Sequence, residues 1–322
     1  MMIRRNVTFA IAVVLLLAAA CSRPPHTQGE QRTAQRTPQD IIVTQEISGT
    51  LLGVKLNRPF GVAPDMQRVV YVCDAGNDRV LRFDKEMIAA AESGGYGSSE
   101  GLLDRPSFIT VDNSLNLWIS DAGNRRVCRF NTRLNYVDDI SFLDQEDPLE
   151  FGVPSGSAVT DYGTVWIADR EKNRIAVFDI VGNFDRFIGD FGYGGGQLLH
   201  PEKIVVNSRG DRYIVCDAGN RRLVVYDGYG NYKQEIKLWD MDYPIAASVD
   251  DRNFIWALDR TNGAIEYLSP RGAKLFEIGP VIPGSEKPLL NPSDIAVLAD
   301  GRLLISDTGN NRLVLCQVMY PE

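Results

Sequence analysis

Histidine is scarce in this sequence. The 322 residues contain two, His26 and His200. Nucleophilic triads and most protein zinc sites use histidine as a base or a ligand. His26 lies in a polar N-terminal stretch, and His200 stands beside Pro201. We therefore expect neither kind of chemistry here, and we expect His200 to be an ordinary loop residue.

An excess of positive charge is also missing. The formal net charge is −8, and without residues 1–20, which hold two arginines, it is −10 (−8 − 2). A positive field supplies most of the affinity of proteins for nucleic acids. The acidic balance therefore predicts that nucleic acid is not a partner.

The apolar run from Phe9 to Ala20 is too short for a transmembrane helix. Arg4 and Arg5 precede it, and small residues lead from it to Cys21. This segment resembles a bacterial lipoprotein signal, in which cleavage after residue 20 leaves Cys21 as a lipidated N-terminus. An ordinary secretory signal cut near the same point is the alternative.

Residues 21–40 hold Pro, Gln, Thr and Arg and almost nothing apolar. Such a segment cannot bury enough surface to order itself, so we expect a disordered tether. Acyl chains on Cys21 would anchor the protein to a membrane of the bacterial cell envelope. Residues 41–322 would then form the folded domain.

A seven-residue pattern recurs along residues 41–322. Its four best copies read Asp, Ala or Thr, Gly, Asn, any residue, Arg, and Val or Leu, and they begin at Asp74, Asp121, Asp217 and Asp307. Two worn copies begin at Asp169 and Asp259, and the second has lost the arginine. The six copies start 47, 48, 48, 42 and 48 positions apart (121−74, 169−121, 217−169, 259−217, 307−259). This period is typical of a stacked or circular repeat protein.

Each repeat contains the pattern of four short β-strands. Repeat four has runs at 201–207, 212–217, 222–227 and 232–238, rich in β-branched and aromatic residues and bounded by turn residues. A four-stranded sheet needs cover on its faces, and radial packing of six such blades provides it. The exception is 85–93, where a Met-Ile-Ala run predicts a short helix in place of the fourth strand of repeat one.

The two ends of the repeat region complement each other. The sixth repeat stops after three strands, the last at 312–318, and a strand-like segment at 41–53 precedes the first repeat. We predict that residues 41–53 supply the outer strand of the sixth blade and close the ring. The expected fold is all-β, a six-bladed β-propeller of four-stranded antiparallel blades.

The segment from Gly196 to Pro201, followed by Cys216 to Leu223, resembles an NHL repeat. The resemblance extends from about Leu56 to the end of the chain, and it implies a six-bladed β-propeller. It says little about function, because propellers host both binding modules and enzymes. The histidine-bound zinc of some NHL-like lyases is excluded here by the scarcity of histidine. Some animal NHL domains bind RNA. The expected export of this protein and its acidic charge argue against RNA binding here.

Aspartate and arginine stand five positions apart in five of the repeated turns. They can face each other across the hairpin, while the aspartate accepts backbone N–H groups and Gly-Asn supplies positive φ. We interpret them as structural pairs that close each hairpin; a ring of charge for an anionic ligand is the alternative. The pairs are Asp74 with Arg79, Asp121 with Arg126, Asp169 with Arg174, Asp217 with Arg222, and Asp307 with Arg312.

Four cysteines remain after Cys21, and in an exported protein they invite disulfides. Cys73 and Cys216 occupy the same place in repeats one and four, whereas Cys128 and Cys316 lie on the next strand of repeats two and six. Different blades would put them mostly beyond disulfide reach. We expect buried free thiols.

The strand starts that follow each repeat's proline are candidates for a metal site. Related six-bladed lactonases and phosphotriesterases hold calcium there through Glu, Asn and Asp. In this chain Glu202 and Asp294 are the acidic residues at these positions, and Lys203 could neutralise one of them. We expect no cofactor and no metal ligand, with calcium as the alternative.

The face that carries the repeated turns would also carry the loops before each first strand. It combines arginines with aromatic residues, as protein–protein hot spots do. We expect no catalytic residue and propose ligand-binding positions at Phe60, Phe108, Glu202, Lys203, Tyr243 and Asp294. The predicted function is binding of an envelope protein or glycan. The alternatives are a calcium-dependent hydrolase or lactonase and a purely structural scaffold, and the worn repeats three and five are the favoured places for function.

Overall fold

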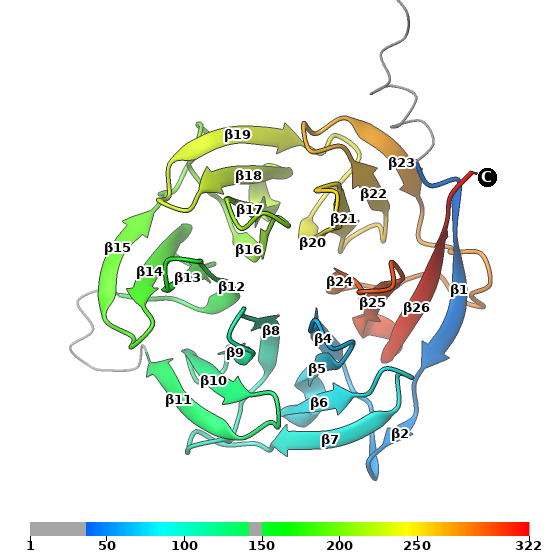
Figure 1. Ribbon diagram of the computed structural model, residues 1–322, viewed down its shortest axis with the longest axis horizontal. Helices are drawn as coiled ribbons and strands as arrows, with labels where there is room; N and C mark the ends of the chain where they lie inside the picture. Colours follow the sequence, from blue (N-terminus) through cyan, green and yellow to red (C-terminus); the bar gives the residue numbers. More distant parts are fainter. Residues whose placement is uncertain (1–36, 142–149, 322) are drawn as a thin grey trace, which may run out of the picture. The chain divides into compact units, whose positions relative to one another are not determined.

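The computed structural model describes residues 37–141 and 150–321 (Figure 1). The expected signal peptide, the lipidation site Cys21 and His26 lie outside the described residues, as does the tether up to residue 36. Six four-stranded antiparallel sheets surround a central axis like the blades of a propeller. The predicted fold class is therefore confirmed. The described residues contain no helix that is long and apolar enough to cross a membrane.

Blades one to three follow the chain in order, from the axis outward. Blade one consists of β4 (Pro59–Pro64), β5 (Val70–Asp74), β6 (Arg79–Phe83) and β7 (Ala89–Gly94). Blade two consists of β8 (Pro106–Val111), β9 (Asn116–Asp121), β10 (Arg126–Asn131) and β11 (Tyr136–Ser141). Blade three consists of β12 (Pro154–Val159), β13 (Thr164–Asp169), β14 (Arg174–Asp179) and β15 (Phe184–Ile188).

Blades four and five repeat that order, and blade six departs from it. Blade four consists of β16 (Pro201–Val206), β17 (Arg212–Asp217), β18 (Arg222–Asp227) and β19 (Tyr232–Lys237). Blade five consists of β20 (Pro244–Val249), β21 (Ile255–Asp259), β22 (Ile265–Leu268) and β23 (Lys274–Ile278). Blade six consists of β24 (Asp294–Val297), β25 (Leu303–Asp307), β26 (Arg312–Met319) and, as its outer strand, β1 (Asp40–Ile47).

The N-terminal strand closes the ring as predicted. Strand β1 pairs antiparallel with β26, with Asp40 opposite Met319 and Ile47 opposite Leu313. The paired segment is shorter than predicted, because the chain turns away after Ile47. Residues 50–55 instead form a small separate hairpin of β2 (Thr50–Leu51) and β3 (Val54–Lys55).

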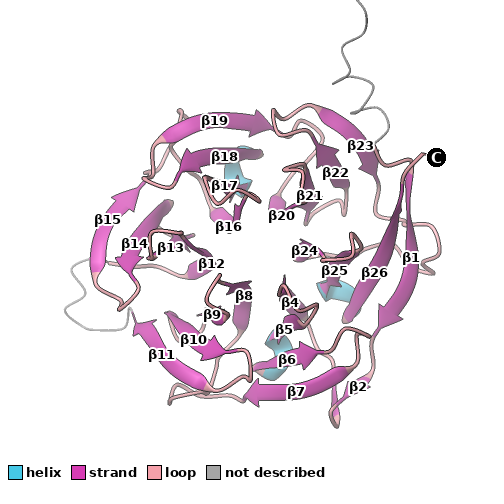
Figure 2. Ribbon diagram, viewed as in Figure 1, coloured by secondary structure: helices cyan, strands magenta, loops and turns pink. Residues whose placement is uncertain are grey.

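The helix predicted at residues 85–93 is wrong. Asp84 accepts N–H groups of Glu86 and Ile88 and holds a tight turn, with Met87 at φ 60°. Residues 89–94 then form β7, which pairs with β6 and completes blade one. Helix propensity differs by less than about 1 kcal/mol per residue, so the backbone hydrogen bonds offered by β6 override it. Strands and loops make up nearly all of the ring, apart from single 3₁₀ turns (Figure 2).

Large apolar side chains from neighbouring blades fill the space between the sheets. Trp166 of blade three stacks on Tyr213 of blade four with ring centroids 4.7 Å apart, and both are fully buried. An aromatic pair of this kind contributes about 1 kcal/mol beyond its area burial. The four cysteines of the ring are likewise buried free thiols, as expected, and burial raises the pKa of Cys316 to about 12.

Candidate binding face and channel mouth

The ring has two faces, which differ in their loops. We call the face that carries the turns after Asp74, Asp121, Asp169, Asp217, Asp259 and Asp307 the loop face. The long connections into each blade's first strand reach the same face, because each blade is an antiparallel meander. Asp217 shows the contact directly: its Oδ1 accepts the N–H of Leu199, from the loop before β16, at 2.6 Å. The hairpins between first and second strands lie on the opposite face.

We call the turns of blades one, two, four and six the well-kept turns. In each of them the aspartate is buried and accepts hydrogen bonds from two segments of the chain. In blade one, Asp74 accepts the N–H of Asn57 through Oδ1 at 2.8 Å and the Nε–H of Arg79 through Oδ2 at 2.8 Å. Its side chain is fully buried. The aspartate therefore ties its own hairpin to the loop before the blade. The same Nε to Oδ2 bond, at 2.7–2.8 Å, joins Asp121 to Arg126, Asp217 to Arg222 and Asp307 to Arg312.

Neither the glycine nor the asparagine of these turns supplies the positive φ, contrary to expectation. Positive φ, near 54°, is found two residues later, at Asp78 in blade one. The glycine is needed because the preceding loop lies against it: a Cβ on Gly76 would stand 2.8 Å from the carbonyl oxygen of Asn57. The Gly76 N–H donates to that same oxygen at 2.9 Å. Glycine thus permits a close backbone approach.

The two worn turns keep the aspartate and change its surroundings. Asp169 stands 3.6 Å from the Nε of Arg174, a longer contact than in the other pairs. Asp259 accepts the N–H of Tyr243 at 2.7 Å, while Ala264 occupies the place of the arginine. Both worn turns carry an arginine directly after the aspartate, where the other four have alanine or threonine; these are Arg170 and Arg260.

Arg170 and Arg260 line a cavity of about 190 Å³ at the axial end of the loop face, which we call the channel mouth. Arg58 and Arg105, from the loops into blades one and two, line it as well. Phe60 and Phe108 form its aromatic wall, with ring centroids 5.2 Å apart in an edge-to-face arrangement. The guanidinium of Arg260 lies 5.6 Å from the centroid of the Phe60 ring.

Glu202 is the acidic group of the channel mouth, and its side chain is 1% exposed. Its Oε1 accepts the hydroxyl of Tyr243 at 2.6 Å and lies 3.6 Å from an Nη atom of Arg170. Its Oε2 is buried and has no hydrogen-bond partner among the described residues. Burial raises the pKa of the Glu202 carboxyl, and Arg170 opposes that rise.

Lys203 and Asp294 were predicted to be ligand-binding positions together with Glu202. They instead form a separate buried pair. The Nζ of Lys203 on β16 stands 2.5 Å from Oδ1 of Asp294 on β24. The other carboxylate oxygen accepts the N–H of Val62 on β4 at 2.9 Å. The pair therefore connects blades four, six and one inside the ring. Of the six predicted positions, Phe60, Phe108 and Glu202 line the channel mouth, Tyr243 supports Glu202, and Lys203 and Asp294 join blades.

His200 lies in the loop before β16, on the loop face. Its side chain is exposed, and its backbone N–H donates to Asn173 at 2.8 Å. Among the described residues, three acidic side chains come close enough to share a metal ion on blade five: Asp240, Glu266 and Glu277. The ammonium of Lys274 pairs with each of them, at 2.6 Å from Glu277 and 3.6 Å from Glu266. This cluster is an ion-pair network.

Comparison with known proteins agrees with the architecture. A family model described as a 6-bladed beta-propeller matches residues 118–269, and the NHL repeat model matches residues 289–314. The chain is a six-bladed β-propeller with an NHL repeat. Among curated proteins, Protein brain tumor of Drosophila melanogaster is 26% identical over 131 residues, which are 40% of this chain and 13% of that protein.

Solved structures resemble the whole propeller. A streptogramin B lyase structure gives a TM-score of 0.63 at 11% identity, covering 88% of this chain and 99% of that one. A gluconolactonase from Xanthomonas campestris gives a TM-score of 0.63 at 15% identity, covering 88% of this chain and 96% of that one. At these identities the likeness shows a shared fold alone.

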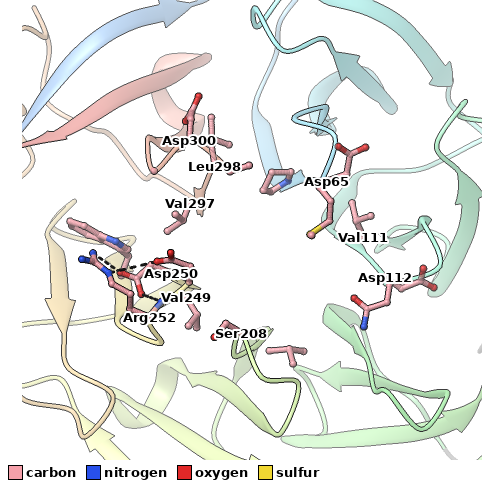
Figure 3. Close-up of a pocket in the computed structure, with 18 of the residues that line it drawn as sticks. Asp65, Val111, Asp112, Ser208, Val249, Asp250, Arg252, Val297, Leu298 and Asp300 are labelled. Carbon is pink, nitrogen blue, oxygen red and sulfur yellow. Dashed lines mark hydrogen bonds and ion pairs between the residues drawn. The ribbon is translucent and has the colours of Figure 1, made fainter. Parts of the chain in front are cut away.

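The propeller has a larger cavity, of about 800 Å³, at its opposite face (Figure 3). Sequence reasoning did not find it. Its throat is apolar, with Val111, Val249 and Val297 ending the first strands of three blades. The aspartates around it close their own hairpins: Asp250 accepts the N–H groups of Arg252 and Phe254 at 2.9 Å. Its acidic rim is therefore largely explained by the fold.

Proposed function

We propose that this propeller is a lipid-anchored protein of the bacterial cell envelope that binds a partner through its loop face. The partner is an envelope protein or glycan, and it places an anionic group in the channel mouth. The observation that carries the proposal is the convergence of Arg58, Arg105, Arg170 and Arg260 on one small cavity of a chain with net charge −8. Nucleic acid and a resident cofactor have no part in it.

The chemistry of the channel mouth supports binding of an anion. Guanidinium groups pair with carboxylates and phosphates through directed hydrogen bonds. Phe60, whose ring packs against the buried Phe108, adds apolar contact, and aromatic residues with arginine dominate the energetics of binding surfaces. A cavity of about 190 Å³ admits one chemical group rather than a whole ligand. The partner would therefore spread over the loop face and insert one charged group.

The same groups do not favour a calcium-dependent hydrolase. Four guanidiniums at the channel mouth would repel a divalent cation, and Lys203 already neutralises Asp294. The Oγ of Ser155, which also lines the cavity, donates to the carbonyl of Pro201 at 2.8 Å. It is held by the backbone framework, and a carbonyl is not a base that activates a nucleophile.

The N-terminal strand begins at the opposite face of the ring. The N–H of Gln39 donates to the carbonyl of Met319, at the end of β26 away from the loop face. A tether leading to a lipidated Cys21 would therefore join the ring at that end of β1. Cys21→Ser is expected to release the protein from membranes, and unchanged fractionation would contradict the anchor.

The experiment is affinity capture from native envelopes after crosslinking. The Arg170→Ala/Arg260→Ala double variant should lose a partner that the wild type captures. The control is Arg133→Ala, which removes an exposed arginine from the turn between β10 and β11 on the opposite face. Equal capture by all three proteins would refute the role of the channel mouth.

A further inference from the structure

A second cavity lies on the outer part of the loop face, at the end of β19. It measures about 360 Å³, within the usual range for small-molecule sites. Tyr193, from the loop before β16, and Trp239, from the loop before β20, contribute its large aromatic side chains. We call this cavity the Trp239 groove. It is separate from the channel mouth, with which it shares no lining residue.

The exposure of its aromatic residues is not required by the fold. Trp239 is 80% exposed and Tyr193 is 72% exposed, whereas the other three tryptophans are buried between blades. Leu238, directly before Trp239, and Met241, two residues after it, are each 1% exposed. The chain on both sides is therefore anchored in the core, which leaves Trp239 facing outward. Large aromatic side chains gathered on a solvent-facing surface mark sites of interaction.

The aromatic groups of the groove are positioned by their neighbours. The N–H of Leu238 donates to the carbonyl of Arg221 at 3.0 Å, which fixes the backbone that carries Trp239. The ring of Tyr193 packs edge-on against Phe191, with centroids 6.2 Å apart. Lys237 lies 5.4 Å from the indole centroid of Trp239. The groove is therefore a formed surface with a charged edge.

Polar side chains line the groove beside its aromatic residues. Asn220 is held in place by its Nδ2, which donates to the carbonyl of Gly192 at 2.9 Å and to Asp217 at 2.8 Å. The carboxylate of Glu235, which also lines the groove and is 29% exposed, pairs with Arg222 through one oxygen and lies 3.6 Å from Lys237 through the other. A carboxylate has about four acceptor positions, so a ligand in the groove that offers a hydrogen-bond donor can still bind it.

We propose that the Trp239 groove is a saccharide-binding site. A pyranose ring presents an apolar C–H face to an aromatic side chain and hydroxyl groups around its edge. Those hydroxyls can donate to Glu235 and accept from Arg221 and Lys237. A proline-rich peptide also fits aromatic grooves, but its prolines have no N–H to donate to Glu235. The groove would bind sugar whether or not the channel mouth binds an anion.

The test uses Trp239 itself as the reporter, since it is the exposed tryptophan among the four. Tetrasaccharides of glucose, mannose and N-acetylglucosamine, in α- and β-linked forms, are titrated against the full chain. At least one should change the indole emission saturably. Calorimetry should then show that Trp239→Ala and Tyr193→Ala each weaken that sugar by about tenfold or more.

Matched variants separate this site from others. Tyr96→Ala removes a 78%-exposed aromatic side chain from the loop before β8 and should leave sugar binding unchanged. The Arg170→Ala/Arg260→Ala variant should also bind sugar normally, so failure of the channel mouth and failure of the groove can be told apart. Saturable binding of decaproline in place of sugar, or no response to any tetrasaccharide, would overturn the proposal.

Discussion

The well-kept repeats and the worn repeats of this propeller differ in the residues that their turns carry. In blades one, two, four and six the turn places a small residue after the aspartate and closes on a buried arginine. In blades three and five an arginine follows the aspartate and lines the channel mouth, and the closing arginine is more distant or replaced. The repeated residues therefore serve the fold, and we infer that the two turns that depart from the repeat serve binding.

The largest expected effect comes from removing the closing arginine of a kept turn. Arg222→Ala would leave Asp217 buried without its charged partner, and breaking a buried pair in this way costs about 3–5 kcal/mol. Arg174→Ala in the worn turn should cost less than half as much, because its side chain is more exposed and its contact with Asp169 is longer. Urea unfolding of both variants measures the difference. Equal losses would show that the worn turn is as structural as the others.

A pH-dependent effect is expected at the channel mouth. Burial raises the pKa of Glu202 above its reference value of 4.5, so the folded protein binds a proton that the unfolded chain releases. Its contribution to the free energy of unfolding is therefore fully present below pH 4.5. This contribution is lost as the pH rises from 4.5 to the raised pKa of the folded state. Glu202→Gln removes this decline while keeping an acceptor for Tyr243. The check is the difference in unfolding free energy between the two proteins across that interval.

A smaller effect separates binding from calcium chemistry. Because the channel mouth is lined by arginines and Asp294 is paired, millimolar calcium should not stabilise the propeller. The melting temperature in calcium should match that in chelator. A melting temperature several degrees higher in calcium would favour the hydrolase alternative. It would mean that residues assigned here to the fold, such as Asp294, bind the ion.

Much of the fold follows from the sequence, for identifiable reasons. The regular spacing of the turns fixes six blades, and the missing and spare strands fix the closure between β1 and β26. The helix predicted at 85–93 failed because pairing with β6 outweighs alanine's propensity. The expectation that Gly-Asn supplies positive φ was also wrong: the positive φ falls on the residue after the asparagine, and the glycine is constrained by the loop packed against it.

The candidate site was only partly predictable. The worn repeats were visible in the sequence, and each showed an arginine after its aspartate. Phe60, Phe108 and Glu202 were found from their places after the blade prolines and do line the channel mouth. The ion pair of Lys203 and Asp294 joins residues 91 positions apart, on two non-adjacent blades, so no local sequence pattern could predict it. The cavity of the opposite face depends on loops of several blades, which meet only in the ring, and the Trp239 groove depends on loops that meet only when blade four folds.

The most direct test compares a worn-turn variant and a kept-turn variant in two assays. Arg170→Ala/Arg260→Ala and Arg126→Ala are each measured for unfolding free energy and for capture of the proposed envelope partner below their melting transitions. We predict that the double variant loses the partner and less stability than Arg126→Ala, because Arg170 is 42% exposed and stands 3.6 Å from Glu202. Arg126→Ala, which breaks a buried pair with Asp121, should lose more stability and keep the partner. Loss of the partner only in Arg126→Ala, or unchanged capture by the double variant, would contradict the division between structural and functional repeats.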